Sequence, residues 1–167
     1  MSRLDSMIRR LCAQRDCLAF AASMIRELPG PVFELGLGNG RTFDHIRTLM
    51  PEREIFVFDI VIVEQIESAL DPALLIVGDV CETLPAHLAK THQKAVLIHN
   101  DLDDVGGNIE DQQHSIYCWL SPLIRDAAAP GAVIVSNTKL DLDDWHRIQL
   151  PEGHAPDRYF MYQRPCR

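Results

Sequence analysis

The sequence has no long apolar run and no sign of a leader segment. A membrane-spanning helix needs about 18 or more consecutive apolar residues, and no run in this chain approaches that length. The N-terminus carries Asp5, Arg9 and Arg10 among its apolar residues, which is unlike the apolar centre of a signal peptide. We therefore expect neither a membrane span nor a signal peptide.

Paired cysteines and an excess of positive charge are also missing. The five cysteines are scattered, odd in number and without C-x-x-C spacing: Cys12, Cys17, Cys81, Cys118 and Cys166. This pattern favours reduced thiols in the cytoplasm over a disulfide framework or a zinc site. The net charge of -8 argues against an extended nucleic-acid-binding surface. We expect a cytoplasmic protein that binds no nucleic acid.

The chain also lacks repeats and low-complexity tracts, and its 167 residues suit a single domain over 1–167. Short apolar runs that indicate buried strands lie at 32–35, 55–58, 74–77, 95–98 and 132–135. Helical spacing of apolar residues is found at 2–28, 42–50, 62–70, 84–93 and 110–128. This alternation predicts an α/β fold, a doubly wound and mainly parallel sheet with helices on both faces.

A glycine-rich stretch follows the first of these strands. Gly36, Gly38 and Gly40 occupy alternate positions, and helical spacing resumes at Thr42. A strand, a glycine turn and a helix bring bare backbone close to a ligand at the N-terminus of the helix. Unpaired N–H groups and the positive end of the helix dipole favour a carboxylate or phosphate there. The stretch predicts a ligand-binding turn, although a tight turn in an unrelated α/β protein has the same pattern.

The spacing of the glycines separates two cofactor families. The dinucleotide fingerprint G-x-G-x-x-G/A requires a small residue where this chain has Arg41, three positions after Gly38. The acidic Glu34, two positions before Gly36, completes the pattern E-x-G-x-G-x-G. This pattern resembles the first motif of class I S-adenosylmethionine (SAM) dependent methyltransferases. An NAD-dependent oxidoreductase is the less favoured alternative.

The resemblance implies a set of cofactor contacts. In that family the glycine turn passes under the methionine part of SAM, and the acidic residue, here Glu34, helps to hold the amino group through water. Asp59, at the end of the second strand, would accept hydrogen bonds from both ribose hydroxyls. Asp79 would meet the amine of adenine, and the next N–H a ring nitrogen. The expected set is Glu34, Gly36, Gly38, Asn39, Gly40, Thr42, Asp59, Ile60, Asp79, Val80 and Asn100. The cofactor implied by the resemblance is SAM, which becomes S-adenosylhomocysteine (SAH) after methyl transfer.

Asp79 also has a purely structural interpretation. It stands before a helical segment, and Glu82 three residues later completes the pattern of a capping box. An aspartate can cap a helix and contact a ligand at once, so both roles stay open for this residue.

The resemblance further implies the layout of the chain. The strand order of the family is 3-2-1-4-5-7-6, with an antiparallel hairpin at the C-terminal end. The chain then divides into an N-terminal helical segment (1–29), a cofactor-binding core (30–137) and a C-terminal hairpin (138–167) in which 146–150 pairs with 158–163. The helix expected before this hairpin is reduced to about one turn at 142–145, which departs from the family pattern.

A polar cluster follows the fourth strand, where α/β folds place their ligands. It contains His99, Asn100, Asp101, Asp103 and Asp104. Methyl transfer from SAM is an in-line displacement, which needs alignment and, for a protonated nucleophile, a base. Asp101 is our first candidate for that base and His99 the second, although a histidine at the end of a strand is as often a structural residue.

Residues for a metal are incomplete. Some small-molecule O-methyltransferases of this fold bind a divalent cation through an aspartate after the fourth strand and an Asp-Asn pair after the fifth. This chain has Asp101 but Ser136 and Asn137 in place of the pair, and hard cations prefer several charged oxygen ligands. We expect no metal site. His87 and His92 do not share a helix face and are expected at the surface.

The acceptor is expected to be a small molecule, because the chain has no added substrate domain. Its pocket wall would come from the N-terminal helix, the loop after Asp101, the hairpin or a partner subunit, and Tyr159 and Tyr162 would line that wall or fill core. The stretch 17–22 is apolar nearly all round, so a homo-oligomer through this helix is a further expectation. A SAM-binding sensor or partner subunit without activity is the main alternative, and an aminopropyltransferase a minor one.

Overall fold

A computed structural model of the protein describes residues 2–62, 70–102, 116–156 and 158–166. Several predicted features lie outside these residues. They are most of the helix at 62–70, the first part of the helix at 110–128, and Asp103 and Asp104 of the polar cluster.

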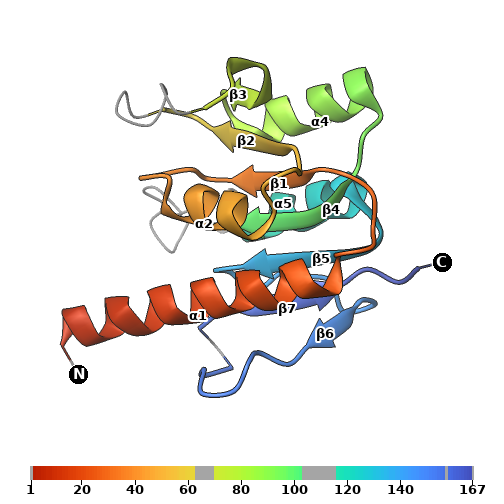
Figure 1. Cartoon of the computed structure of the whole chain (residues 1–167). Helices are drawn as coiled ribbons and strands as arrows, with labels where there is room; N and C mark the ends of the chain where they lie inside the picture. The colour runs from red at the N-terminus through yellow and green to blue at the C-terminus, as the bar shows by residue number, and fades with distance from the viewer. Residues whose placement is uncertain (1, 63–69, 103–115, 157, 167) are drawn as a thin grey trace.

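Seven strands form one sheet. They are β1 (Val32–Leu35), β2 (Ile55–Asp59), β3 (Leu75–Val77), β4 (Ala95–Asn100), β5 (Ala128–Ser136), β6 (His146–Ile148) and β7 (Phe160–Gln163). Their order is β3-β2-β1-β4-β5-β7-β6, which confirms the predicted order. The first five pair in parallel, and β7 runs antiparallel to both β5 and β6 (Figure 1). The ends of β1, β2, β3 and β4 therefore meet at one carboxyl edge.

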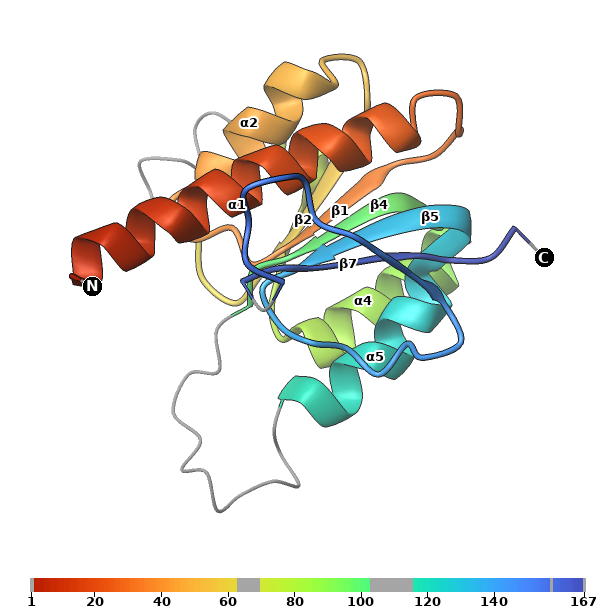
Figure 2. The same cartoon turned by 90° about the horizontal axis from the view of Figure 1, so that it is seen from below.

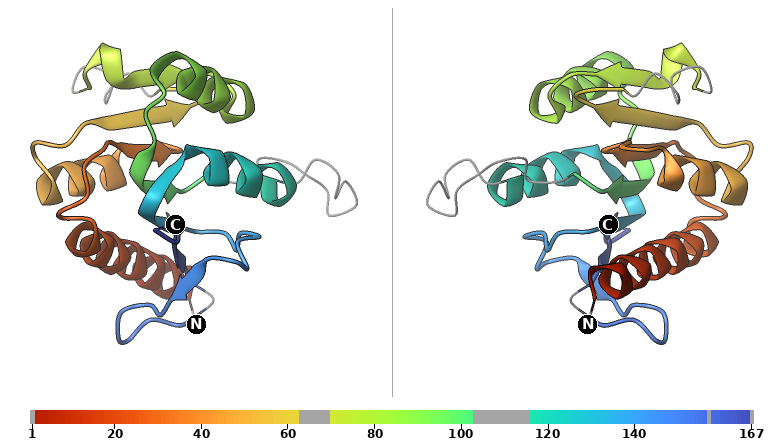
Figure 3. Two further views of the ribbon diagram at one scale, coloured as in Figure 1. Left: turned by 90° about the vertical axis from the view of Figure 1, so that its right-hand side faces the viewer. Right: turned by 90° about the vertical axis from the view of Figure 1, so that its left-hand side faces the viewer.

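Helices cover both faces of this sheet, as predicted. α1 (Arg3–Met24) and α2 (Arg41–Leu49) lie on one face, and α4 (Val80–Thr91) and α5 (Ile116–Ala127) on the other (Figures 2 and 3). A short 3-10 helix, η1 (Pro72–Leu74), precedes β3. Side chains alternate along each strand, so that Val32 joins the apolar cluster under α1 and α2 while Phe33 joins the one under α4 and α5.

Some boundaries differ from the prediction. α4 begins at Val80, not at 84, because Asp79 caps it and Pro85 is accommodated inside the helix. β5 begins at Ala128, so Pro130 and Gly131 lie within the strand, where the register with β4 shifts between Ala95 and Leu97. The single helical turn predicted at 142–145 is a hydrogen-bonded turn instead, closed by the Trp145 N–H on the Leu142 carbonyl at 2.9 Å.

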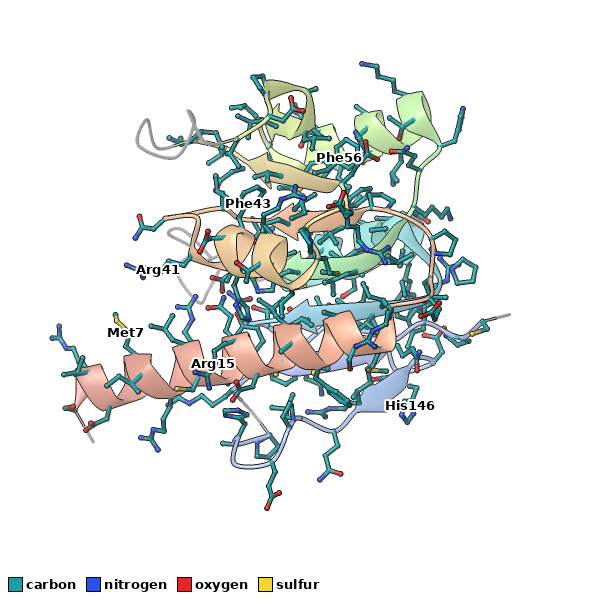
Figure 4. The ribbon with its side chains drawn as sticks, viewed as in Figure 1. Met7, Arg15, Arg41, Phe43, Phe56 and His146 are labelled. Carbon is teal, nitrogen blue, oxygen red and sulfur yellow. The ribbon has the colours of Figure 1, made fainter. Side chains whose placement is uncertain are left out.

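The N-terminal half of α1 extends past the carboxyl edge of the sheet (Figure 1). A capping box between Ser2 and Asp5 starts the helix. In this N-terminal half, the exposed large apolar residues are Leu4, Met7, Ile8 and Leu11, which form an apolar stripe. Met7 projects on the side of α1 where Arg41 begins α2 (Figure 4). The apolar stripe thus overhangs the edge at which the glycine turn lies.

Candidate active site

The glycine turn joins β1 to α2 in backbone conformations that favour glycine. Gly36, Gly38 and Gly40 have φ values of +87°, +50° and +69°. A Cβ added at Gly36 would lie 3.0 Å from the carbonyl oxygen of Asp101, so the turn presses directly on the end of β4. A Cβ at Gly38 would meet nothing within 4 Å. The turn is therefore tight on its inner side and open on its outer side.

Asp59 ties the tip of β2 to this turn. Its Oδ2 accepts hydrogen bonds from the N–H groups of Leu37 at 2.7 Å and Gly38 at 3.2 Å. Its Oδ1 accepts from the N–H of Val61 at 3.3 Å. These bonds hold the partly exposed carboxylate beside the glycines, with acceptor capacity remaining on Oδ1.

The tips of β2 and β3 carry an exposed apolar ledge. Ile60 and Val61 are each 66% exposed and Val77 57%, and a backbone bond from Gly78 to Asp59 joins the two tips at 2.9 Å. Exposed aliphatic side chains grouped beside a polar turn are suited to the flat face of an aromatic ligand.

Asp79 stands at the same edge and caps α4. Its Oδ1 accepts from the Cys81 N–H at 2.8 Å, while the Glu82 N–H bonds to the Asp79 carbonyl oxygen at 3.0 Å. The predicted N-cap is thus confirmed. The reciprocal bond from the Glu82 side chain that would complete a capping box is not formed among the described residues. The Val80 side chain is buried under α4.

Glu34 and His99 form a fully buried pair between β1 and β4. The two residues are register partners, and the Glu34 Oε2 lies 2.8 Å from His99 Nδ1. The hydroxyl of Thr42, the second residue of α2, donates to the other oxygen. Burial by itself lowers the pKa of His99, but the charge and hydrogen bond of Glu34 and the charge of Asp101 together outweigh burial, so the pKa of His99 is raised above its ordinary value.

Asp101 lies just beyond β4, beside Gly36, and its carboxylate accepts three hydrogen bonds. Arg10 donates to Oδ1 at 2.7 Å, Gln14 to Oδ2 at 3.0 Å and the Tyr159 hydroxyl to Oδ1 at 3.2 Å. The Asp101 side chain retains 20% exposure. It is a fixed carboxylate that still faces solvent at the carboxyl edge.

Asn100 points to the opposite face of the sheet. Its side-chain amide donates to Ser136 Oγ at 3.0 Å and to the Asn137 side chain at 3.3 Å. The same carboxamide accepts from the Leu102 N–H at 3.4 Å. Asn100 therefore joins the ends of β4 and β5 through hydrogen bonds. Asn39 lies in the glycine turn and is exposed.

The structure brings Glu34, His99 and Asp101 together with three residues that were not assigned to the site from sequence. These are Arg10 and Gln14 of α1, and Tyr159, which was expected only as wall or core. Gln14 had a detectable signal, because it is a polar residue in the middle of the buried face of α1 formed by Ala13, Cys17, Leu18 and Ala21.

Other candidate features do not belong to this edge. A hollow of about 590 Å³ lies at the amino ends of the strands, lined by Pro29–Pro31, Glu52–Glu54, Gln93 and Lys94. Within the described ranges, no three His, Cys, Asp or Glu side chains gather as metal ligands. No described helix is long and apolar enough to cross a membrane. His87 is not a plain surface residue, because its ring packs against Phe33, Phe56 and Phe58.

The sheet order and the glycine turn at its carboxyl edge define a class I methyltransferase. The model of a family described as S-adenosyl-L-methionine methyltransferase matches residues 1–164, and the chain belongs to that family. It is therefore a SAM-dependent methyltransferase. No curated protein matches the sequence.

Solved structures agree with this family. An S-adenosyl-L-methionine methyl transferase from Silicibacter pomeroyi DSS-3 is 39% identical, with a TM-score of 0.84 over 98% of this chain and 99% of that one. A SAM-dependent methyltransferase from Neisseria gonorrhoeae is 17% identical (TM-score 0.55, 88% and 70% covered). A release-factor-specific protein-(glutamine-N5) methyltransferase from Alicyclobacillus acidocaldarius is 14% identical (0.53, 92% and 93%). The last two share the fold alone.

Proposed function

We propose that this methyltransferase acts on a small molecule that presents an N–H or O–H group to Asp101. The observation that carries the proposal is the position of this carboxylate, which adjoins Gly36 at the carboxyl edge and keeps part of its surface exposed. A carboxylate can accept about four hydrogen bonds, and three are already present on Asp101. Counting the described residues, one hydrogen-bond position on the carboxylate is left for the N–H or O–H group of the methyl acceptor.

The residues at the carboxyl edge fit the cofactor. The open outer side of Gly38 leaves room for a ligand against the backbone, and Asp59 Oδ1 has acceptor capacity for a ribose hydroxyl. The apolar ledge of Ile60, Val61 and Val77 would pack on adenine, with Asp79 near its amine. The cofactor, when bound, supplies a methyl group on a sulfonium ready for displacement. The chain's own part is to fix Asp101 and to align the acceptor.

Glu34 would act on the cofactor from behind the turn. Both of its carboxylate oxygens are engaged, one by Thr42 and one by His99, and the side chain is fully buried. Its contribution is therefore to hold the start of α2 and the strand pair in place beneath the amino group, rather than to touch that group.

A small acceptor fits the charge and size of the chain. The net charge of -8 disfavours nucleic acid, and the similar solved chain from Silicibacter pomeroyi has nearly the same extent. The described cysteines are free thiols, as suits a reducing cytoplasm. The apolar stripe of Leu4, Met7, Ile8 and Leu11 supports a homo-oligomer through α1; a single monomeric species in sedimentation at micromolar concentration would contradict that part.

The first test is a thermal-shift comparison of SAM, SAH and NAD. A ligand at about 100 times its dissociation constant stabilises a fold by about 2.7 kcal/mol, and we expect a rise of about 5 °C or more with SAM and SAH but not with NAD. SAH release is then measured with SAM and a panel of small amines, phenols and alcohols. SAH binding without release by any acceptor would favour a SAM-binding sensor, and stabilisation by NAD alone would contradict the proposal.

A further inference from the structure

Four polar side chains from separate parts of the chain meet beneath Asp101. Gln14 comes from α1, Glu34 from β1, His99 from β4, and Tyr159 from the residue before β7. These four are buried, and only Asp101 retains exposure. Unpaired polar groups are costly in such a position, so each member must have a partner.

The chemistry of the groups fixes the direction of the hydrogen bonds. The Gln14 Nε2 has only hydrogens to give, and it lies 2.7 Å from the Tyr159 hydroxyl and 3.0 Å from Asp101 Oδ2. The Tyr159 oxygen accepts from Gln14, so its single hydrogen is available to Asp101 Oδ1 at 3.2 Å. The amide of Gln14 cannot be reversed without setting its oxygen against the Asp101 carboxylate.

His99 extends this chain to Glu34. Its Nδ1 must carry a hydrogen to face the Glu34 carboxylate at 2.8 Å. When the ring is charged, it also carries a hydrogen on Nε2, for which the Tyr159 oxygen at 3.4 Å is the acceptor. In that state the 3.5 Å approach of Gln14 Nε2 to His99 Nε2 joins two donors and is only a contact. The rings of His99 and Tyr159 lie parallel, 6.3 Å apart.

A tyrosine needed only for packing would not require this arrangement. A phenylalanine would fill the same space without a buried hydroxyl, and a leucine would serve for Gln14. The chain of bonds instead ends at the one exposed member, which lies against the glycine turn. The buried groups therefore orient a carboxylate at the site, beyond any part they have in the core.

We propose that Tyr159, locked by Gln14, is the positioning residue for Asp101, and that its hydroxyl links the acceptor-facing carboxylate to the Glu34–His99 pair. The proposal rests on the proposed function in one respect, that Asp101 faces the acceptor. Its consequence is that the orientation of Asp101 and the charge state of His99 depend on each other through one hydroxyl group.

The test compares Tyr159→Phe with Tyr162→Phe. Tyr162 is the other buried tyrosine of the hairpin, and its hydroxyl accepts from the Leu140 N–H at 3.0 Å on the opposite face. Each substitution removes one buried hydroxyl and keeps the ring. The protein carries ¹⁵N-labelled histidine and ¹³C-labelled aspartate, and NMR follows the His99 ring through pH together with the Asp101 Cγ at pH 7.

We expect Tyr159→Phe to lower the pH at which His99 loses its charge by about half a unit or more, because the charged ring loses an acceptor. The Asp101 Cγ signal should move in the same variant, and Tyr162→Phe should change neither signal. Of the residues that the structure describes, Glu34, Gln14, Asp101, Arg10 and Tyr159 face His99, and the tyrosine substitution alters only one of them directly.

If Tyr159→Phe does not fold, Gln14→Leu provides the second arm, and it should also move the Asp101 signal. Wild-type signals in Tyr159→Phe, or equal movement in Tyr162→Phe, would overturn the proposal. SAH binding is measured on the same samples by calorimetry. If the wild-type protein does not bind SAH, the proposed cofactor site is wrong. The two NMR signals still decide the role of Tyr159 in that case.

Discussion

The two halves of the carboxyl edge make their polar contacts over very different distances along the chain. In the half that we propose for the cofactor, called the cofactor half, Asp59 bonds to Leu37 22 positions away and Asp79 to Cys81 two positions away. In the half that we propose for the methyl acceptor, called the acceptor half, Gln14 bonds to Tyr159 145 positions away and Arg10 to Asp101 91 positions away. Short-range contacts follow from a local motif. Long-range contacts exist only when the sheet has closed, so the acceptor half depends on the whole fold.

The largest expected effect is in the acceptor half. His99→Leu leaves the buried Glu34 carboxylate without its ion-pair partner. Breaking a buried ion pair in this way costs about 3 to 5 kcal/mol of unfolding free energy. His87→Leu is the matched control, because His87 also lies among apolar rings but its Nε2 has no hydrogen-bond partner among the described residues. We expect this control to be neutral or stabilising. Urea denaturation measures both, and equal losses would contradict the pairing.

Two substitutions in the glycine turn distinguish an effect on stability from an effect on cofactor binding. Gly36→Ala places a Cβ against the Asp101 carbonyl at a φ of +87°, and we expect a loss of about 2 to 4 kcal/mol in stability. Gly38→Ala meets nothing within 4 Å, so its cost should stay near 1 kcal/mol, as for a left-handed alanine. The added methyl group should nevertheless obstruct the ligand. A Gly38→Ala protein that binds SAH like the wild type in calorimetry would place the cofactor elsewhere.

Asp59→Asn tests the cofactor half with the turn kept intact. The amide oxygen of asparagine can still accept from Leu37 and Gly38, but the second oxygen is lost as an acceptor. We expect SAH affinity to fall by about 10- to 100-fold, or roughly 1.4 to 2.8 kcal/mol, with little change in stability. Asp71→Asn is the control and should bind SAH normally, because the Asp71 side chain accepts from the Ala73 N–H at the start of η1.

Asp79→Asn distinguishes a cap from a ligand contact. Asparagine caps helices about as well as aspartate, so the free energy of unfolding should be nearly unchanged. An amine of adenine would lose a charged acceptor, and we expect SAH affinity to fall by roughly tenfold. Unchanged affinity, measured by calorimetry, would leave Asp79 as a helix cap alone.

The smallest expected effect is on the pH dependence of stability, to which His99 and His87 contribute in opposite directions. The pKa of His99 is raised in the fold, so its stabilisation is complete below pH 6.5 and is lost as the pH rises through the folded value. Burial lowers the pKa of His87, so its contribution is present above pH 6.5 and lost as the pH falls. The cost of His99→Leu should therefore shrink as the pH rises above 6.5. A cost that grows with pH would reverse the assignment.

The fold was largely predictable because strands and helices are recorded in local patterns of apolar residues. The short runs at β1, β2 and β4 and the hairpin spacing predicted the strand order through the family resemblance, and the structure confirms it. The errors fall where local signals conflict. Pro130 and Gly131 predicted a stop but lie inside β5, and Pro85 delayed the predicted start of α4 although it is tolerated within the helix.

The sequence by itself determined the glycine turn, the acidic residues at the strand tips and the polar cluster after β4, because each is a short motif whose backbone geometry is local. Only the tertiary structure decided how Gln14, His99, Asp101 and Tyr159 meet. Their partners come from α1, from two neighbouring strands and from the hairpin. Hydrogen bonds between buried groups require separations near 3 Å, and a chain reaches such separations between distant residues only through the packing of its whole sheet.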